Sequence, residues 1–399
     1  MEAVQFQSCI IAAMMRPESK GGAATHMRTV KKFLSGHLNR IEIVSPVDAP
    51  SYLVYPVFAI RAVLMRLNRA AGTWWFRRVH FLLLRSALKR RLRFAHPPTI
   101  LYAQCPLSAR AALETRAKAD KVAMVVHFND SQADEMVLSG AIAKDGRLYD
   151  SIRSLEESVI PKVDLLVFLS DYMRQQITRR IPAIAGVPSA VIPNFVEPSD
   201  CEPSSFKGDF ISLGLLVPRK NNRFTLQVLY ECARLGYKFT LSIVGEGPER
   251  AQLEQLCSRL GLQEQVHFHG DQANPLPLLK SHRVLLHASK LDNMPYALLE
   301  ALSCSQPIVA ARVGGIPEIL SGNENGVFWD LEDPEGSAQL LIRLMTDGAF
   351  YDRLSEGAWR TYDAKFSARS VSARFLAALT DGNTERADVD KAEPCETVF

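Results

Sequence analysis

Apolar runs of strand length alternate with helical patterns along almost the whole of this 399-residue chain. In the first half, the runs that predict strands occupy residues 6–14, 40–44, 99–102, 121–127, 165–169 and 190–192. In the second half they occupy 209–216, 239–244, 266–268, 284–287 and 308–311, with helical patterns between them, for example at 223–235, 249–260 and 337–345. Strands separated by helices are typical of parallel sheets with crossover connections. The sequence therefore predicts an α/β protein with two doubly wound units.

The predicted units are separated by a linker. Residues 195–207 are rich in proline and small polar residues, the composition of a connecting segment. We therefore expect one domain over residues 1–194 and another over 208–366, and the chain is long enough to give each its own core. A last helix is expected over 367–380, followed by a polar tail, 381–399, whose composition predicts disorder.

The overall composition is that of a folded, soluble-class protein, with 47% hydrophobic and 23% charged residues. Its seven cysteines are scattered and form no Cys-x-x-Cys pair, which argues against a disulfide framework or a zinc site. The first apolar run has no basic region before it, so it is interpreted as a strand rather than a signal peptide. No run approaches the ~20 apolar residues of a membrane-spanning helix. We therefore expect a cytoplasmic protein without a transmembrane anchor and without a metal.

The charge is unevenly distributed, although the net charge is only +4. The segment 49–113 contains eleven basic residues and no Asp or Glu, and aromatic residues lie among them. Basic groups beside an apolar face are typical of a helix that docks on an anionic membrane surface. The residues expected to face the membrane are Arg66, Trp74, Trp75, Arg77, Arg78, Arg90 and Arg91. The alternatives are a solvated helical face and, without any recognition motif, nucleic-acid binding.

The chemistry of a binding site is concentrated between Leu291 and Leu320. Asp292 precedes Glu300 by eight positions, and Glu300 lies in a short apolar helix that leads into a strand and the turn Gly314-Gly315. A Gly-rich turn that opens a helix offers backbone N–H groups to an anion. A buried carboxylate is costly unless it accepts hydrogen bonds, and sugar hydroxyls are suitable donors. The pattern predicts a phosphate cradle beside a hydroxyl-binding carboxylate, which is the chemistry of a nucleotide-sugar pocket.

This segment resembles the donor-site signature of the family-4 retaining glycosyltransferases. That family shows two Glu separated by seven residues, then a Pro-Val-Val strand and a Gly-Gly-x-x-Glu turn. The matching residues are Glu300, Pro307, Gly314, Gly315 and Glu318, with Asp292 in place of the first Glu. The resemblance covers nearly the whole chain and implies the GT-B fold, in which two Rossmann-like domains face each other across a cleft. It also implies that the last helix crosses back to the N-terminal domain, which holds the acceptor.

A second match concerns the cations that bind the donor diphosphate. The family has an Arg and a Lys in the motif Gly-Arg-x-x-x-x-Lys-Asn, and Lys220 matches the Lys. The Arg position is occupied by Leu215, so one cation is missing from its usual place. Arg219 is adjacent to Lys220 and is a candidate substitute.

The remaining site residues are implied by the same resemblance. Glu300 would accept hydrogen bonds from the ribose, Asp292 from the transferred sugar, and His127 would lie near that sugar without acting as a base. Together with Lys220 and Arg219 these residues form the expected catalytic set. The further donor contacts would be Gly21, Gly22, Gly214, Gly245, Glu246, Gly247, Pro248, Asn293, Met294, Pro295 and Tyr296.

The expected function is that of a retaining glycosyltransferase that uses a nucleotide-diphosphate sugar, with UDP-sugars favoured and GDP-sugars next. In such enzymes the departing diphosphate takes the acceptor's proton, so no cofactor or metal is expected. The expected acceptor is a glycan or a lipid-linked group at the cytoplasmic face of the membrane, in surface polysaccharide or glycolipid assembly. The alternatives are a nucleotide-sugar-binding subunit with impaired catalysis and a GT-B epimerase or phosphorylase.

Overall fold

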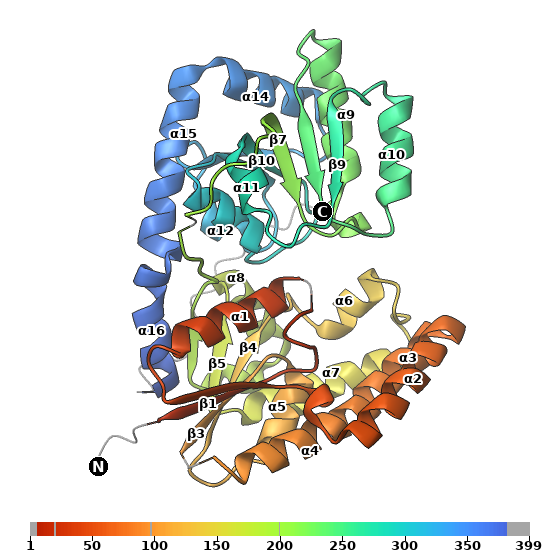
Figure 1. The fold of residues 1–399 in the computed structure, drawn as a ribbon, viewed down its shortest axis with the longest axis vertical. Coiled ribbons are helices and arrows are strands. Elements are labelled where there is room, and N and C mark those ends of the chain that lie inside the picture. Colours follow the sequence, from red (N-terminus) through yellow and green to blue (C-terminus); the bar gives the residue numbers. More distant parts are fainter. Residues whose placement is uncertain (1–5, 20, 96–97, 199, 381–399) are drawn as a thin grey trace. The chain divides into compact units, whose positions relative to one another are not determined.

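The computed structural model describes residues 6–19, 21–95, 98–198 and 200–380 (Figure 1). The chain divides into two compact units, one formed by Met1–Pro193 with Ser372–Phe399 and the other by Asn194–Val371. The tail predicted over 381–399 lies outside the described residues.

The N-terminal unit is built on a parallel sheet. Within the described residues its six strands are β1 (Ser8–Ala12), β2 (Arg40–Val44), β3 (Thr99–Ala103), β4 (Lys121–Val126), β5 (Leu165–Phe168) and β6 (Ser189–Val191). They are arranged in the order β2-β1-β3-β4-β5-β6. The central strands β1 and β3 are buried along their whole length, as expected for a sheet that helices cover on both faces.

Helices connect these strands. The main ones are α1 (Gly22–Leu34), α5 (Pro106–Leu113), α6 (Gln132–Leu138), α7 (Arg147–Val159) and α8 (Asp171–Arg180). The acid-free segment adds α2 (Ser51–Leu67), α3 (Arg69–Trp75), the π-helical turn η2 (Phe76–His80) and α4 (Phe81–Leu92). The end of the last helix, α16 (Ala368–Thr380), belongs to this unit. There the Lys121 Nζ donates to the carbonyl oxygens of Ala378 and Leu379, at 3.1 and 2.7 Å.

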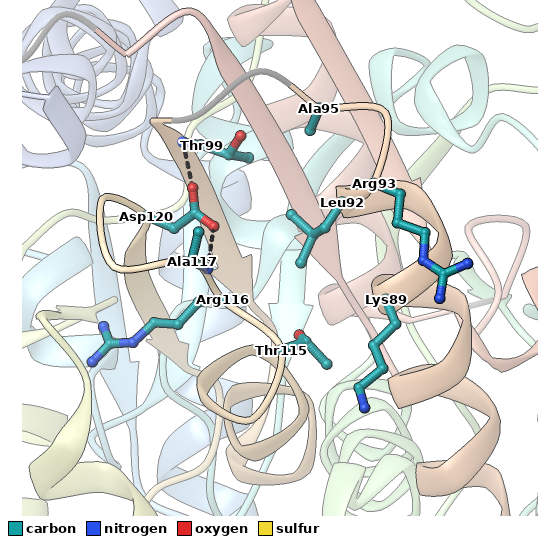
Figure 2. Close-up of a pocket in the computed structure, with 9 residues that line it drawn as sticks. All are labelled: Lys89, Leu92, Arg93, Ala95, Thr99, Thr115, Arg116, Ala117 and Asp120. Carbon is teal, nitrogen blue, oxygen red and sulfur yellow. Dashed lines mark hydrogen bonds between the residues drawn. The ribbon is translucent and has the colours of Figure 1, made fainter.

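A surface pocket of this unit lies where the strands begin (Figure 2). It is lined by residues around Thr99 and Asp120, which stand at the starts of β3 and β4. The Asp120 carboxylate is used structurally, because it accepts the backbone N–H groups of Thr99 and Ala117 at 2.9 and 2.8 Å. No residue of the expected site lines this pocket, and ligands of such sheets bind at the opposite, carboxyl edge.

The C-terminal unit is built on a second parallel sheet. In the part of the chain that the structure describes, its six strands are β7 (Gly208–Leu213), β8 (Leu241–Val244), β9 (Val266–Gly270), β10 (His282–His287), β11 (Ile308–Ala311) and β12 (Gly326–Trp329). They are arranged in the order β12-β11-β10-β7-β8-β9. The flanking helices include α9 (Asn222–Arg234), α10 (Arg250–Arg259), α12 (Tyr296–Ser303), α13 (Ile316–Ile319), α14 (Pro334–Thr346) and α15 (Gly348–Thr361).

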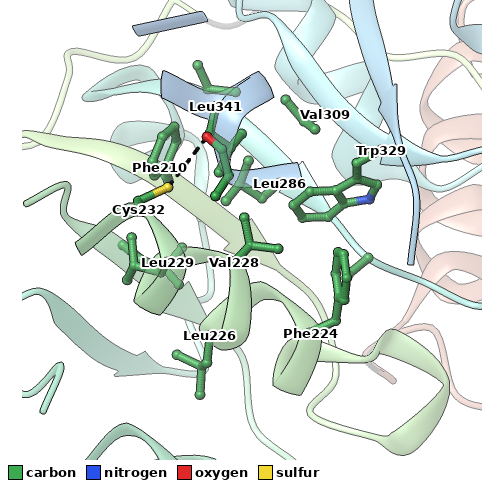
Figure 3. Packing of buried hydrophobic residues seen from close by; sticks show 14 of the residues in the cluster. Phe210, Phe224, Leu226, Val228, Leu229, Cys232, Leu286, Val309, Trp329 and Leu341 are labelled. Atoms are coloured by element: carbon green, nitrogen blue, oxygen red, sulfur yellow. Dashed lines mark hydrogen bonds between the residues drawn. The ribbon is translucent and has the colours of Figure 1, made fainter. Parts of the chain in front are cut away.

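The core of this unit lies between the sheet and helices α9 and α14 (Figure 3). Val228 and Leu341 bring helix side chains against Leu286 of β10. Strand β12, which the sequence did not predict, contributes Trp329, whose ring packs edge to face on Phe224 at 5.1 Å. Each apolar run predicted as a strand does become one, and the prediction of two doubly wound units is confirmed by the strand orders.

The strand orders also locate the ligand-binding edges. In a doubly wound sheet, ligands bind beyond the carboxyl ends of the strands at the point where the chain reverses its direction across the sheet. In the N-terminal sheet this switch point lies between β1 and β3, and in the C-terminal sheet it lies between β7 and β10. The loops that follow these four strands are therefore the first places to look for a site.

Candidate active site

The loop after β7 carries the two expected cations. Arg219 and Lys220 lie in a short 3-10 turn, η5 (Pro218–Lys220), whose first residue is a proline with a preset backbone angle. Asn221 ends the turn in the left-handed conformation, with φ 53°, and helix α9 starts directly after it. The turn thereby fixes both basic residues at the switch point.

Asp292, in the loop after β10, brings the cations together. Its Oδ2 lies 2.5 Å from the Lys220 Nζ, 3.5 Å from the Arg219 Nη1 and 3.2 Å from the His287 Nε2. The side chains of Lys220 and Asp292 are each only 15% exposed. We call these four residues the Asp292 cluster. Three of its members were predicted from the sequence, and their side chains do meet.

The charge state of the Asp292 cluster follows from its burial and its cations. Burial by itself raises the pKa of Asp292, but the positive charge of Lys220 and the groups of His287 and Arg219 outweigh it, so the pKa lies well below its usual range. Burial, followed by the charge of Lys220, lowers the pKa of His287. At neutral pH the cluster therefore holds two cations, one carboxylate and a neutral imidazole. One positive charge is left for an anionic ligand.

Arg219 lies beside the same carboxylate as Lys220, whereas the side chain of Leu215 offers no charge. Leu215 is 49% exposed and carries no charge. The guanidinium of Arg219 turns toward the same Asp292 oxygen as Lys220 and also donates to the carbonyl oxygen of Leu291 at 2.6 Å. Side chains of consecutive residues need not point in the same direction, but these two basic groups both lie near the Asp292 Oδ2.

The turn Gly314-Gly315 braces Asp292. The Gly315 N–H donates to the carbonyl oxygen of Asp292 at 3.1 Å. Gly314 has φ 55°, and a Cβ at this position would overlap the same carbonyl oxygen. The turn was expected to present its N–H groups to an anion, but the Gly315 N–H is used to hold the Asp292 loop.

The loops after β7 and β8 pack backbone against backbone. A Cβ on Gly245 would overlap the carbonyl oxygen of Gly214, and a Cβ on Gly247 would overlap that of Leu216. This close packing is by itself a sufficient reason for glycine at positions 245 and 247, so a ligand contact is not needed to account for them. The side chain of Glu246, which was expected to contact the donor, is half exposed and forms an ion pair with Arg250.

Glu300 lies in the middle of helix α12, which Leu298, Leu299 and Leu302 anchor in the core. Burial raises the pKa of the Glu300 carboxyl group to about 7. No residue in the described part of the chain forms a hydrogen bond or ion pair with that carboxyl group. Glu300 is partly exposed, so its carboxyl group is reachable, and a carboxylate without a protein partner is suited to accept hydrogen bonds from ligand hydroxyl groups.

The four residues before and at the start of α12 are largely buried. Asn293, Met294 and Tyr296 are buried, and Pro295 caps the helix. The Met294 carbonyl oxygen accepts a hydrogen bond from the Asn194 Nδ2 at 2.7 Å. The buried Asn293 Oδ1 has no hydrogen-bond partner among the described residues. This turn is therefore held in place while an acceptor atom stays unused.

The N-terminal unit contains the other expected residues, Gly21 and Gly22 in the connection after β1 and His127 directly after β4. Gly21 caps α1 with φ 105°, and a Cβ on Gly21 or Gly22 would meet nothing within 4 Å. Beyond β4, the His127 Nε2 lies 3.0 Å from the Gln104 Oε1, and its ring is 5.0 Å from that of His26. Burial, followed by the charge of His26, lowers the pKa of His127 well below its usual value, which keeps the imidazole neutral.

Sequence reasoning missed His287 and Gln104. His287 is the last residue of β10, and Gln104 directly follows β3. Both positions are strand ends, and the strand-end argument that selected His127 applies equally to them. The signal was therefore present in the sequence.

The expected membrane-facing set is partly wrong. Arg66, Trp74, Arg78 and Arg90 are exposed, but Arg77 is buried, with only 9% of its surface exposed. Trp75 and Arg91 are half-buried, and the Trp75 Nε1 donates to the carbonyl oxygen of Val57 at 3.0 Å. Arg77 is turned inward because it lies in the π-helical turn η2, whose wider spacing changes which side chains share a face.

The surface of this segment is instead apolar along α2. Tyr52, Tyr55, Val63 and Leu67 are 74, 76, 57 and 78% exposed, and Val54 is the buried residue of this fully described helix. None of the helices in the described chain has the length and apolar character needed to cross a bilayer. Among the described residues, no group of three or more His, Cys, Asp or Glu side chains is placed to hold a metal ion.

The two halves of the chain match two family models. Residues 20–200 match the model described as Glycosyltransferase Family 4, and residues 204–360 match that of Glycosyl transferases group 1. An N-acetyl-alpha-D-glucosaminyl L-malate synthase from Bacillus anthracis is 30% identical over 135 residues, 34% of this chain and 35% of that protein. A lipopolysaccharide core biosynthesis glycosyltransferase, LpsD, from Rhizobium meliloti is 28% identical over 176 residues, 44% of this chain and 50% of that protein. The matched stretches thus span about a third to a half of these relatives.

Solved structures show the same fold over almost the whole chain. Sucrose-phosphate synthase from Thermosynechococcus elongatus superposes with a TM-score of 0.70 at 14% identity, covering 94% of this chain and 98% of that one. HepE from Anabaena, solved with UDP-glucose, superposes with a TM-score of 0.65 at 16% identity, covering 94% and 99%. Because consecutive family models cover most of the sequence and these structures share its two sheets, the chain belongs to the group 1/family 4 glycosyltransferases and has the GT-B fold.

Proposed function

We propose that the protein is a retaining glycosyltransferase that moves a sugar from a nucleoside-diphosphate donor to a glycan or lipid-linked acceptor. The observation that carries this proposal is the Asp292 cluster at the switch point of the C-terminal sheet, with one uncompensated positive charge. A diphosphate is the complementary ligand for two converging cations. The unpartnered carboxyl group of Glu300, in the same unit, supplies the acceptor for ribose hydroxyls.

In this mechanism Lys220 exchanges partners. In the structure its ammonium group is held by Asp292. When the donor binds, the diphosphate takes the place of Asp292 beside Lys220 and Arg219, and the freed Asp292 carboxylate accepts a hydrogen bond from the transferred sugar. The cations then stabilise the charge that grows on the leaving group, which is how such a site lowers the barrier.

The bond changes balance without a protein base. The bond between the anomeric carbon and the diphosphate oxygen breaks, and the acceptor hydroxyl oxygen bonds to the same carbon on the same face. The proton of that hydroxyl passes to the departing diphosphate. His127 is therefore given no proton-transfer role, in agreement with its lowered pKa. Lys220 and Arg219 supply positive charge at the diphosphate, so we propose that turnover requires no divalent ion.

UDP-sugars are the favoured donors and GDP-sugars the next. Solved structures of the same fold carry UDP, including HepE from Anabaena, and a mannosyltransferase from Mycolicibacterium smegmatis that is 30% identical over 149 residues is named as GDP-mannose-dependent. One relative is named as a lipopolysaccharide core biosynthesis glycosyltransferase and another as a phosphatidylinositol N-acetylglucosaminyltransferase subunit, which supports a place in surface polysaccharide or glycolipid assembly.

Peripheral association with the cytoplasmic face of the membrane is part of the proposal. It is supported by the exposed apolar side chains of α2 and by the exposed arginines Arg66, Arg78 and Arg90 in a segment that has no acid. Apolar insertion combined with basic residues gives a helix affinity for anionic lipid.

The decisive experiment measures nucleotide binding and nucleotide release separately. Calorimetric titration with UDP and GDP tests the donor site, and the release of free nucleoside diphosphate from a panel of nucleotide sugars tests turnover. Binding with release supports a transferase. Binding without release from any donor would instead assign a nucleotide-sugar-binding subunit, and absence of nucleotide binding would reject the site.

A further inference from the structure

Two polar side chains meet where neighbouring strands of the N-terminal sheet end. Gln104 directly follows β3 and His127 directly follows β4, and the two strands are paired. The His127 Nε2 lies 3.0 Å from the Gln104 Oε1. The carboxyl ends of parallel strands are where such sheets bind their ligands. The pair therefore stands at the ligand-binding edge, beside the switch point between β1 and β3.

Gln104 is fixed in position and buried. Its backbone N–H donates to the carbonyl oxygen of Ala12 and to the Ser108 Oγ, both at 3.0 Å, and the residue is 5% exposed. Its Nε2 is buried and has no hydrogen-bond partner among the described residues. A buried donor without a partner destabilises the folded state, so this glutamine needs a reason other than stability. Within the described chain, the contact with His127 is the one hydrogen bond that its side chain forms.

This contact decides where the proton of the His127 ring lies. A carbonyl oxygen can only accept, so the His127 Nε2 must donate and carries the proton. Burial, followed by the charge of His26, lowers the pKa of His127, so the ring is neutral and has a single ring proton. Its Nδ1 is then unprotonated and can only accept. No described residue bonds to Nδ1, and His127 is partly exposed, so a ligand can reach the ring.

The surroundings hold this ring in place and leave room near it. The His26 ring packs edge to face on that of His127, with centres 5.0 Å apart, and the His26 Nε2 lies 2.9 Å from the Tyr102 Oη. Gly22 lies one turn before His26 on the same face of α1, and a Cβ there would meet nothing within 4 Å. In the loop after β4, the buried Asn129 Oδ1 is another acceptor without a partner in the described chain. Unused acceptors and open space thus both occur at this edge of the sheet.

A ring nitrogen that can only accept selects a ligand group that donates, and sugar hydroxyl groups are such donors. We propose that Gln104 is a positioning residue that holds His127 in the tautomer with its proton on Nε2, so that Nδ1 accepts a hydrogen bond from a hydroxyl group of the transferred sugar. The hydrogen bond made by one imidazole nitrogen commonly sets the state of the other in this way. This inference rests on the proposed function, because that function supplies the sugar.

The tautomer is measured without any ligand, by heteronuclear NMR of the histidine ring nitrogens in the full chain, with the His127 signals assigned from His127→Gln. We expect wild-type His127 to have a protonated Nε2 and an unprotonated Nδ1. Gln104→Met keeps the length of the side chain but has no carbonyl acceptor, and it should give a mixture of both tautomers. Tyr102→Phe is the matched control, because it removes the hydroxyl beside His26 and not the bond to His127, and it should leave the His127 tautomer unchanged.

Two results of this measurement overturn the proposal: a proton on Nδ1 in the wild type, and an unchanged tautomer in Gln104→Met. Gln104→Glu is the second variant, in case Gln104→Met folds poorly. Its carboxylate also accepts from Nε2, so at alkaline pH, where the ring is neutral, the proton should stay on Nε2. A proton on Nδ1 in Gln104→Glu would likewise reject the role of Gln104.

Nucleotide sugars then test the ligand. UDP-glucose and GDP-mannose are the probes, and UDP and GDP are the controls because they lack the sugar. A nucleotide sugar that binds should shift the His127 Nδ1 signal, and Gln104→Met should bind it about two- to tenfold more weakly, the effect of one hydrogen bond, with unchanged affinity for the nucleotide alone.

The sugar contact is rejected if a nucleotide sugar binds without moving the Nδ1 signal, or if Gln104→Met loses equal affinity for the nucleotide sugar and the nucleotide. If the wild type binds no nucleotide, the proposed function fails. The tautomer measurement needs no ligand, so it decides the role of Gln104 separately from that failure.

Discussion

Asp292 organises the candidate site at the scale of single residues. Lys220 and Arg219 carry like charges and would repel each other at this distance. The negative charge of the Asp292 carboxylate lies between them and holds both close together before any ligand is present. Long basic side chains lose conformational entropy when they are fixed in one position. Because Asp292 already fixes them in the folded protein, little of this entropy is lost when a ligand binds. In the proposed mechanism, the diphosphate of the donor then displaces the carboxylate.

Replacing Glu300 by Gln is expected to weaken donor binding by about 1.5–3 kcal/mol, because the ribose hydroxyls lose a charged acceptor. The pKa of Glu300 is raised to about 7 in the free protein, so wild-type donor affinity should increase as the pH rises through 7 and the carboxyl group ionises. Titration calorimetry between pH 5.5 and 8.5 measures both effects. The variant should show no such rise, and equal affinity for wild type and variant at pH 8.5 would remove Glu300 from the ribose contact.

The same carboxyl group makes a stability prediction. Because its folded-state pKa is raised from the ordinary 4.5 to about 7, its contribution to stability is complete below pH 4.5 and is lost as the pH rises through 7. Glu300→Gln should therefore unfold with a flatter pH profile over this window in chemical denaturation. Parallel profiles for the two proteins would contradict the raised pKa of Glu300 in the folded state.

Lys220→Ala is expected to lower kcat by about 10²–10³-fold, with a smaller loss of donor affinity, because charge on the leaving oxygen grows as the bond breaks. Arg219→Ala should also lower kcat, but less, since its side chain is 40% exposed and solvent screens its charge. Steady-state kinetics and donor titration on both variants provide the comparison. A silent Arg219→Ala would mean that one cation suffices and that nothing replaces the missing Arg at position 215.

The helices of the acid-free segment differ in how far their side chains are buried. Helix α2 presents tyrosine and aliphatic side chains to solvent, while Gly72 of α3 lets the two helices approach so closely that a Cβ there would overlap Met65. The turn η2 then rotates Arg77 inward. The basic residues of this segment are therefore not one membrane-facing surface, and Arg77 should be excluded from any test of membrane docking.

Replacing Tyr55, Val63 and Leu67 of α2 by Ser is expected to release the protein from vesicles containing anionic lipid. The three side chains are 76, 57 and 78% exposed, so the loss should come from reduced insertion and not from unfolding. Co-sedimentation with vesicles measures it, and Leu235→Ser, at an apolar residue 52% exposed on the C-terminal unit, is the control.

Charge reversal at Arg78 and Arg90 should weaken the same binding by about 1 kcal/mol per residue. Raising the salt to about 1 M, where the Debye length falls to ~3 Å, should have a similar effect on the wild type. If both sets of variants sediment like the wild type, the segment is a solvated flank and the docking proposal is withdrawn.

The whole molecule consists of two compact units, and each contains some of the residues expected from the sequence. Lys220, Arg219, Asp292 and Glu300 all belong to Asn194–Val371, whereas His127 and Arg77 belong to the N-terminal unit. The residues proposed to bind the donor therefore lie in a unit that has its own sheet and its own core.

A nucleotide present at ~100 times its dissociation constant should stabilise the protein by about 2.7 kcal/mol. If the donor site is the one described, hydrogen exchange should show the new protection first in the loops after β7 and β10 and in helix α12. Protection confined to the N-terminal unit would place nucleotide binding elsewhere.

Turnover with a saturating chelator should equal turnover without it, and a loss restored by added divalent ion would contradict the proposed metal independence.

The sequence by itself determined the elements and much of the site. The run Ile308–Ala311 is short, apolar and buried throughout, so local pattern and burial agree there. The run Arg40–Val44 alternates polar and apolar residues, the pattern of a half-buried strand, and its side chains are mostly partly exposed. Strand β12 was missed: it begins at Gly326, a residue typical of turns, and directly follows the polar stretch 321–325. Glu300 and Lys220 were found because their neighbours in the sequence identify them.

Only the tertiary structure decided which of these residues meet. Lys220 and Asp292 are 72 positions apart, and they form an ion pair because β7 and β10 are adjacent in the sheet, an order that no local pattern encodes. The Asp292 carboxylate also lies 3.2 Å from the His287 Nε2 and 3.5 Å from the Arg219 Nη1. Arg77 is the opposite case: its sequence context is that of a surface arginine, and a single π-helical turn buries it. A residue's type and its sequence neighbours can be recognised without a structure. Its contact partners and its burial depend on the order of the strands and the rotation of the helices, which are set when the chain packs.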